Sequence, residues 1–183
     1  MKQLLLVSWL LSLSAILGLP EVKADVRMPL IFGNHMVLQQ DTRITIWGWA
    51  DAGENIEVLF AGQKVRTTAN ADGTWQVKLK PVKTKKKGET LTITGKNKLV
   101  YSDVLVGDVW VASGQSNMEW GIKVRKEYAD DIAHSEDSLL RLFFVPKNTS
   151  LQPLSEIEIP QGTASPERAA RWVLCTPEML AKI

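Results

Sequence analysis

The sequence predicts an α/β protein with an all-β N-terminal domain, in which a small antiparallel β-sandwich precedes the start of a parallel α/β sheet. Short alternating segments separated by turn residues run from Arg43 to Ser102, which is typical of strands with one buried face. From Val104 onward, near-continuous apolar runs favour strands covered on both faces. We therefore expect a leader over residues 1–24, a sandwich over 25–103 and an incomplete α/β domain over 104–183.

The first 24 residues have the features of a cleaved signal peptide. Lys2 precedes an apolar stretch from Leu4 to Leu19, and Val22-Lys23-Ala24 fits a leader-peptidase site. A membrane anchor is the alternative, but serines and a glycine interrupt the stretch and Pro20 ends it, whereas a span needs about 20 apolar residues. We expect export to the periplasm or the exterior, without a stable membrane anchor, and Asp25 as the first mature residue.

The mature chain carries almost no net charge. Removing Lys2, Lys23 and Glu21 from the 22 basic and 20 acidic residues leaves 20 and 19. Because nucleic acids and anionic surfaces select basic proteins, neither is expected as a partner. The one basic cluster, from Lys83 to Gly88, follows Pro81 and is predicted to be a solvated loop.

Six short strands are predicted in the sandwich. The first places Ile44, Ile46 and Ala50 on one face. Trp47 and Trp49 fall on the other face, and for such strand tryptophans core burial is expected in preference to stacking on a ligand. The expected strands are 44–50, 55–60, 64–68, 74–80, 90–94 and 99–104, and such a series favours an antiparallel sandwich.

The region after the sandwich predicts a strand, a crossover and a second strand, which is how an α/β sheet begins. The first strand is expected in the apolar runs Val104–Val106 and Val109–Ala112. The second, Leu139–Val145, is stopped by a proline. Between them, helices are expected from Asn117 onward and over Tyr128–Ser138.

Cys175 is the only cysteine, so no internal disulfide can form and the fold must depend on hydrophobic burial. It follows the apolar segment Trp172-Val173-Leu174, which predicts a thiol in the core rather than a nucleophile. Beyond it, Thr176 can cap a short helix that has Pro177 at its first position.

Ser116 is the residue that points to chemistry. It follows an apolar run and Gly114 and precedes polar residues, as expected when a buried strand delivers a nucleophile to the end of a sheet. A serine hydroxyl is a weak nucleophile until a base takes its proton. His134, on a polar helix-like segment, is expected to be solvated, and His35, near the first strand, to be structural. Two histidines and one cysteine without ligand spacing predict no metal site, and no cofactor is expected.

Several motifs together resemble the sialate O-acetylesterase family of SGNH-type carbohydrate esterases. They are Met36-Val37-Leu38-Gln39-Gln40, Trp47-Gly48-Trp49-Ala50, Asp72-Gly73-Thr74-Trp75, Gly107-Asp108-Val109-Trp110 and Gly114-Gln115-Ser116-Asn117-Met118-Glu119-Trp120. An α/β-hydrolase elbow is the rival for the serine motif, but it needs a glycine two residues after the nucleophile, where Met118 stands. The resemblance covers nearly the whole mature chain and matches the N-terminal part of that family.

The resemblance implies that Ser116 attacks an acetyl ester on a sugar hydroxyl while its own amide helps to hold the oxyanion, and that water then releases acetate. Gln115 and Asn117 would shape the nucleophile turn, and Trp120 could stack on the sugar ring. The substrate would be an acetylated sugar such as O-acetyl sialic acid or an acetylated polysaccharide. The family's later oxyanion residues and its catalytic aspartate and histidine have no counterpart here, so we expect a truncated and inactive form.

A second function, of a different class, stays open. The chain could be a non-catalytic β-sandwich module for protein or glycan contact. An in-frame downstream segment that encodes a late Asp-x-x-His would favour the esterase, and unrelated sequence would favour the module.

Overall fold

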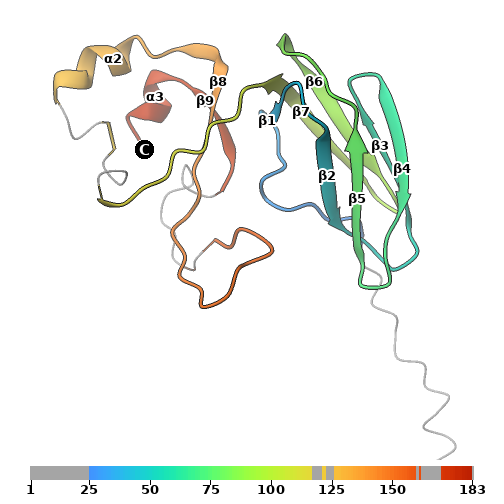
Figure 1. The fold of residues 1–183 in the computed structure, drawn as a ribbon. Coiled ribbons are helices and arrows are strands. Elements are labelled where there is room, and N and C mark those ends of the chain that lie inside the picture. The colour runs from blue at the N-terminus through green and yellow to red at the C-terminus, as the bar shows by residue number, and fades with distance from the viewer. Residues whose placement is uncertain (1–24, 117–120, 123–125, 160, 162–169, 183) are drawn as a thin grey trace, which may run out of the picture.

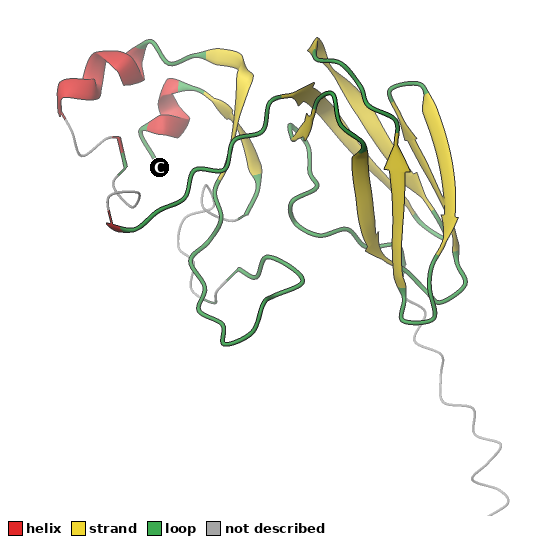
Figure 2. Ribbon diagram, in the orientation of Figure 1, coloured by secondary structure: helices red, strands yellow, loops and turns green. Residues whose placement is uncertain are grey.

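The computed structural model describes residues 25–116, 121–122, 126–159, 161 and 170–182. Strands dominate these residues, and they form a sandwich beside a smaller region that carries the few helices (Figures 1 and 2). The sandwich strands are β1 Val37–Gln39, β2 Ile44–Trp49, β3 Asn55–Phe60, β4 Gln63–Thr68, β5 Thr74–Leu79, β6 Lys85–Thr94 and β7 Lys98–Gly107.

Two sheets make up the sandwich. The larger has the order β1-β7-β6-β3-β4, and the smaller pairs β2 with β5. Pairing is antiparallel except between β1 and β7, where Val37 lies opposite Leu105 in a parallel register. The N-terminal strand β1 therefore runs beside the strand through which the chain leaves the sandwich.

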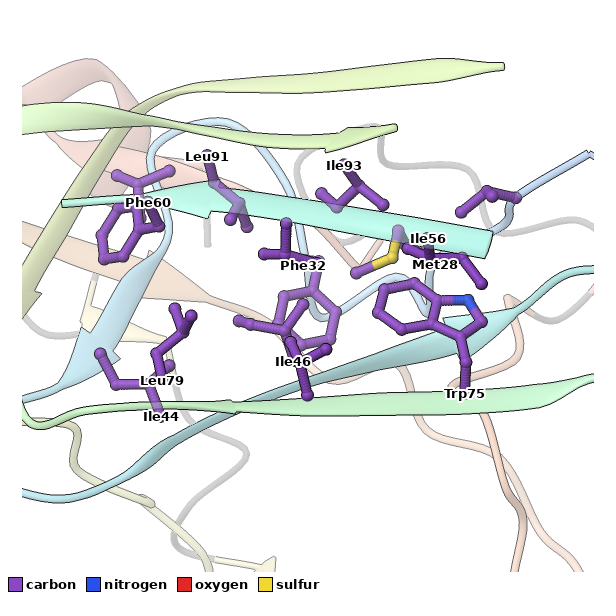
Figure 3. Packing of buried hydrophobic residues seen from close by; sticks show 14 of the residues in the cluster. Met28, Phe32, Ile44, Ile46, Ile56, Phe60, Trp75, Leu79, Leu91 and Ile93 are labelled. Carbon is purple, nitrogen blue, oxygen red and sulfur yellow. The ribbon is translucent and has the colours of Figure 1, made fainter. Parts of the chain in front are cut away.

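Apolar side chains from both sheets fill the space between them (Figure 3). The alternation predicted for the first strand is confirmed, because Ile44, Ile46 and Ala50 are buried. Trp47, on the other face, remains 39% exposed, so the expectation of core burial was wrong for this residue. Trp75 and Phe60 are the bulkiest of the fully buried side chains, and burial of such side chains is the main stabilising contribution to a domain without disulfides.

The expected start of a second domain at Val104 falls inside β7. Val104 and Val106 are buried in the sandwich core, and Leu105 is buried on the opposite face. The run is covered on both faces, as its composition predicted, but it belongs to the sandwich sheet. The predicted lysine loop is partly strand, because β6 begins at Lys85. The first three residues of β6 are exposed, as expected for a solvated segment.

The expected strand Val109–Ala112 is wrong. These residues form an exposed coil in which Trp110 and Val111 are each 90% exposed. An apolar run becomes a buried strand only where neighbouring strands pair with it and other elements cover it. None of the described segments pairs with this one, and burial therefore fails although the residue pattern was suitable.

The smaller region contains the 3₁₀ turn η3 Lys126–Tyr128, α2 Ala129–Ala133, β8 Asp137–Phe143, β9 Trp172–Cys175 and α3 Pro177–Leu180. β8 and β9 pair antiparallel, so the described residues do not form the parallel sheet that was expected here. α2 is shorter than predicted. The cap of α3 is confirmed, since Met179 N donates to Thr176 Oγ at 3.2 Å.

No helix in the described ranges is long and apolar enough to cross a membrane. The predicted leader, residues 1–24, lies outside those ranges, as do Asn117 and Trp120 of the serine motif.

Candidate functional site

Ser116 is the last residue described in the segment that follows β7, and it is exposed, as is Gln115. The start of this coil is fixed to the sandwich. Val109 N donates to Gln39 Oε1 at 2.9 Å, and Gln40 Nε2 donates to Asp108 Oδ1 at 3.1 Å. Gln39 at the end of β1 and Gln40 after it thus hold the chain where it leaves β7, but beyond Val109 the coil is exposed to solvent.

Neither histidine bonds to Ser116 in the described structure. His134 follows α2, and its Nδ1 donates to the carbonyl oxygen of Asp130 at 2.8 Å. His35 lies in the turn before β1, where its Nδ1 is 2.8 Å from Asp103 Oδ2. Both histidines therefore occupy the structural or solvated environments that the sequence predicted, and Ser116 has no general base among the described side chains.

A polar cluster of His35, Asp103 and Arg141, which the sequence did not point to, joins the sandwich to β8. Arg141 Nη2 donates to Asp103 Oδ2 at 3.0 Å, and this is the same oxygen that faces His35. The Arg141 side chain is only 3% exposed, and its Nε has no hydrogen-bond partner. The same Asp103 oxygen therefore forms a hydrogen bond with the partly exposed His35 imidazole and balances the positive charge of the buried Arg141 guanidinium.

The backbone around Asp103 is strained. Asp103 has φ 52° and His35 has φ 65°, in the left-handed region that costs free energy for residues other than glycine. Gly88, on the neighbouring strand β6, gives Asp103 the room that it needs, because a Cβ there would collide with the Asp103 carboxylate. No single-sequence pattern signals such conformations, which explains why the cluster was missed.

The charge state of Asp103 follows from its partners. Partial burial alone would raise the pKa of the carboxyl group, but the hydrogen bond from His35 and the charge and hydrogen bond of Arg141 outweigh it and lower the pKa. The carboxylate is therefore ionised through the neutral range. Its negative charge is what makes burial of Arg141 tolerable.

A second contact joins the two regions. Trp172 Nε1, from β9, donates to the carbonyl oxygen of Ile31 at 2.7 Å, and the indole packs on Phe143 with ring centroids 5.2 Å apart. Trp172 also packs against the sandwich core. The β8–β9 pair is thus docked on the sandwich by the Arg141–Asp103 ion pair and by Trp172, which contributes both a hydrogen bond and apolar packing.

The predicted core thiol is confirmed. Cys175 is 3% exposed and its Sγ lies 3.2 Å from the carbonyl oxygen of Ser135. Burial, together with the nearby charge of Asp137, raises the pKa of the thiol. A protonated, enclosed thiol is a poor nucleophile.

An apolar groove of about 580 Å³ lies where the chain leaves the sandwich. One side is formed by the exposed coil around Trp110 and Val111, and the other by Leu140 and Phe143 of β8, with Leu105 among the lining residues. The groove is a contiguous exposed apolar surface and not an isolated exposed side chain. Contiguous surfaces of this kind mark sites that bind ligands or other proteins. Among the described residues, no cluster of three or more metal-ligating side chains is present.

Comparison with known proteins gives a consistent result. No family model matches the chain. The chain is 32% identical to mouse sialate O-acetylesterase over 141 residues, which is 69% of this chain and 26% of the mouse protein. It is 34% identical to the rat sialate O-acetylesterase, over 68% of this chain and 25% of the relative. The chain thus spans about a quarter of the length of these curated relatives.

A solved structure agrees with these matches. The crystal structure of a novel carbohydrate acetylesterase from Xanthomonas citri superposes with a TM-score of 0.77 and 32% identity. The match covers 86% of this chain and 34% of the Xanthomonas chain. Sequence and fold therefore identify the chain, over the part that aligns, as a member of the sialate O-acetylesterase family.

Proposed function

We propose that this chain is the nucleophile-bearing part of an exported carbohydrate O-acetylesterase of the SGNH type. The observation that carries the proposal is the serine block ending in Ser116, set in a chain whose relatives are acetylesterases. The substrate class is an acetylated sugar, either O-acetyl sialic acid or an acetylated polysaccharide.

Ser116 would attack the acetyl carbonyl carbon. The ester C–O bond then breaks, the sugar leaves with its hydroxyl restored, and water hydrolyses the acetyl-serine to acetate. The Ser116 amide would hold the oxyanion, with Gln115 and Asn117 shaping the turn around it. Trp120 would offer its indole to the sugar ring.

We further propose that the 183-residue chain is inactive by itself. Neither histidine has a hydrogen bond to Ser116 among the described residues, and their Nδ1 atoms contact Asp103 and the Asp130 carbonyl oxygen instead. Without a base, Ser116 keeps its proton, and serine hydrolases that lose triad members retain only about 10³- to 10⁴-fold acceleration over water. This remaining acceleration itself requires an intact oxyanion hole.

Acetate release tests this proposal directly. Purified mature chain and its Ser116→Ala variant should release acetate from acetylated xylan and from O-acetyl sialic acid at the same near-background rate. The Xanthomonas acetylesterase serves as the positive control for the assay. Turnover by the 183-residue chain that depends on Ser116 would overturn the inactivity and would require a base from His134 or from a partner chain.

One observation favours the second candidate, a non-catalytic module. The sandwich closes a core between its own two sheets, whereas the coil that carries Ser116 is uncovered. The test is the DNA downstream of codon 183. If it encodes neither an in-frame esterase segment nor a frameshifted remnant of one, a module for glycan or protein contact becomes the better description.

Export is the remaining part of the proposal. It is supported by the apolar stretch from Leu4 to Leu19 and by the cleavage-site residues that follow it. N-terminal sequencing of the protein recovered from the periplasm or medium should begin at Asp25. Recovery of an intact Met1 form only from the cytoplasm would contradict export.

A further inference from the structure

A second cleft, distinct from the groove beside Trp110, lies between the outer face of β2 and the segment 145–158, a segment that Figure 1 draws in orange. Its volume is about 430 Å³, within the range of about 300–1,000 Å³ typical of small-molecule sites. Trp47 lies on the sandwich side, and Val145 and Pro146 lie on the other. The function proposed above does not use this cleft.

Trp47 gives the cleft an aromatic wall. It lies on the face of β2 that points away from the sandwich core, and Phe32 contacts it edge to face, with ring centroids 4.7 Å apart and an interplanar angle of 75°. The residue is nevertheless 39% exposed. A partly covered indole held by a neighbouring ring presents a rigid apolar surface, onto which the C–H groups of a sugar ring can stack.

The polar groups of the cleft are held by partners. Glu156 accepts from Arg27 at 2.5 Å, and the Arg27 guanidinium lies 3.9 Å from the centroid of the Trp49 ring. Asn148 Nδ2 donates to Glu158 Oε2 at 3.0 Å. Groups that are already oriented lose little entropy when a ligand binds, and carboxylates and amides are suitable partners for sugar hydroxyls.

The charges in the cleft select among sugars. Glu156 is neutralised by Arg27, whereas Glu158 is bonded to an uncharged amide. The net charge is therefore negative, which disfavours a sugar that carries its own carboxylate. A neutral oligosaccharide meets no such penalty.

We infer that this cleft binds a strand of neutral oligosaccharide, with one ring stacked on Trp47 and its hydroxyls bonded by Asn148 and Glu158. The inference rests on the proposed carbohydrate function, and it narrows the substrate class to neutral acetylated polysaccharides rather than O-acetyl sialic acid. The cleft would hold a part of the polymer remote from the acetyl group that reacts.

Calorimetric titration with unacetylated xylohexaose tests the inference. Wild-type mature chain should bind it, and Trp47→Ala should weaken the binding by about tenfold, because an aromatic contact is worth about 1.4 kcal/mol. Trp47→Phe should retain part of the affinity. The matched control is Tyr128→Ala, which removes an aromatic side chain of similar exposure that lies outside both the cleft and the groove and should leave the affinity unchanged.

A charged probe tests the selectivity. Wild type should bind 3′-sialyllactose more weakly than xylohexaose, and Glu158→Gln should reduce that difference. Absence of xylohexaose binding, binding that survives Trp47→Ala in a folded variant, or tighter binding of sialyllactose would each overturn the inference. Xylohexaose carries no ester, so these results are independent of acetate release, whose failure would instead count against the proposed esterase.

Discussion

At the scale of single residues, Asp103 combines several structural roles. Its carboxylate bonds His35 and Arg141, its backbone is in the left-handed region, and its side chain occupies space left by Gly88. Strain of this kind persists only where surrounding contacts compensate for it. The compensation here is the buried guanidinium of Arg141, which has no other carboxylate partner among the described side chains.

Replacing Asp103 with asparagine should therefore loosen the docking of β8. The variant leaves Arg141 buried without a counter-charge, and we expect a loss of about 1–3 kcal/mol, less than for a fully buried pair because Asp103 is partly exposed. Urea unfolding followed by circular dichroism would report this loss as a lower free energy of unfolding. Asp108→Asn is the matched control. Asp108 is exposed and, among the described side chains, accepts hydrogen bonds only from two glutamines, so this substitution should change the free energy of unfolding very little.

The same pair of proteins should differ in its pH dependence. The pKa of Asp103 is lower in the folded chain than in the unfolded one, so the stability due to this group is fully present above pH of about 4 and is lost as the pH falls toward the folded pKa. The difference in free energy of unfolding between wild type and Asp103→Asn should shrink below pH 4. A difference that stays constant from pH 7 to pH 3 would exclude the ionic contribution.

At the scale of elements, β7 shows what the sequence could and could not predict. Alternation correctly placed Ile44 and Ile46 inward, and the cap of α3 was readable in Thr176 and Pro177, because these signals are local. The buried run Val104–Val106 was also recognised, but it was assigned to the wrong sheet. Its pairing with β1 depends on residues almost 70 positions earlier in the chain, which a local pattern does not include. The contacts of Asp103 and the exposure of Trp110 depend on tertiary neighbours and have no local signal.

Two fragments, one ending after β7 and one ending within it, test the position of the boundary. A fragment of residues 25–108 keeps all of β7 and should fold, whereas residues 25–103 lose the buried Val104 and Val106 and the pairing with β1. We expect cooperative thermal unfolding and dispersed amide NMR signals only for the longer fragment. Equal folding of both fragments would show that the second half of β7 contributes little.

At the scale of the whole molecule, the sandwich and the smaller region differ in how their apolar surface is covered. The sandwich encloses a core between two sheets, while Trp110, Val111 and Leu151 are each at least 90% exposed in the remainder. The two regions are joined chiefly through Asp103, Trp172 and an ion pair between Arg27 and Glu156. Local opening of the second region should therefore cost less than unfolding of the sandwich.

Limited proteolysis should reveal this difference. Chymotrypsin should cut first in the exposed coil at Trp110, and a fragment close to residues 25–110 should persist while the remainder is degraded. Mass spectrometry of the time course identifies the fragment. Uniform resistance through residue 182 would mean that the second region is as stable as the sandwich.

The single thiol of this chain has a consequence for its maturation. Cys175, the last residue of β9, is buried with its Sγ against the Ser135 carbonyl oxygen, and its raised pKa keeps the thiol protonated. In an oxidising compartment, such as the one to which we propose the chain is exported, an accessible lone thiol would couple two copies covalently or capture a small thiol. Burial of Cys175 in the folded second region prevents both reactions. The packing that completes the fold therefore also keeps the protein free of mixed and intermolecular disulfides.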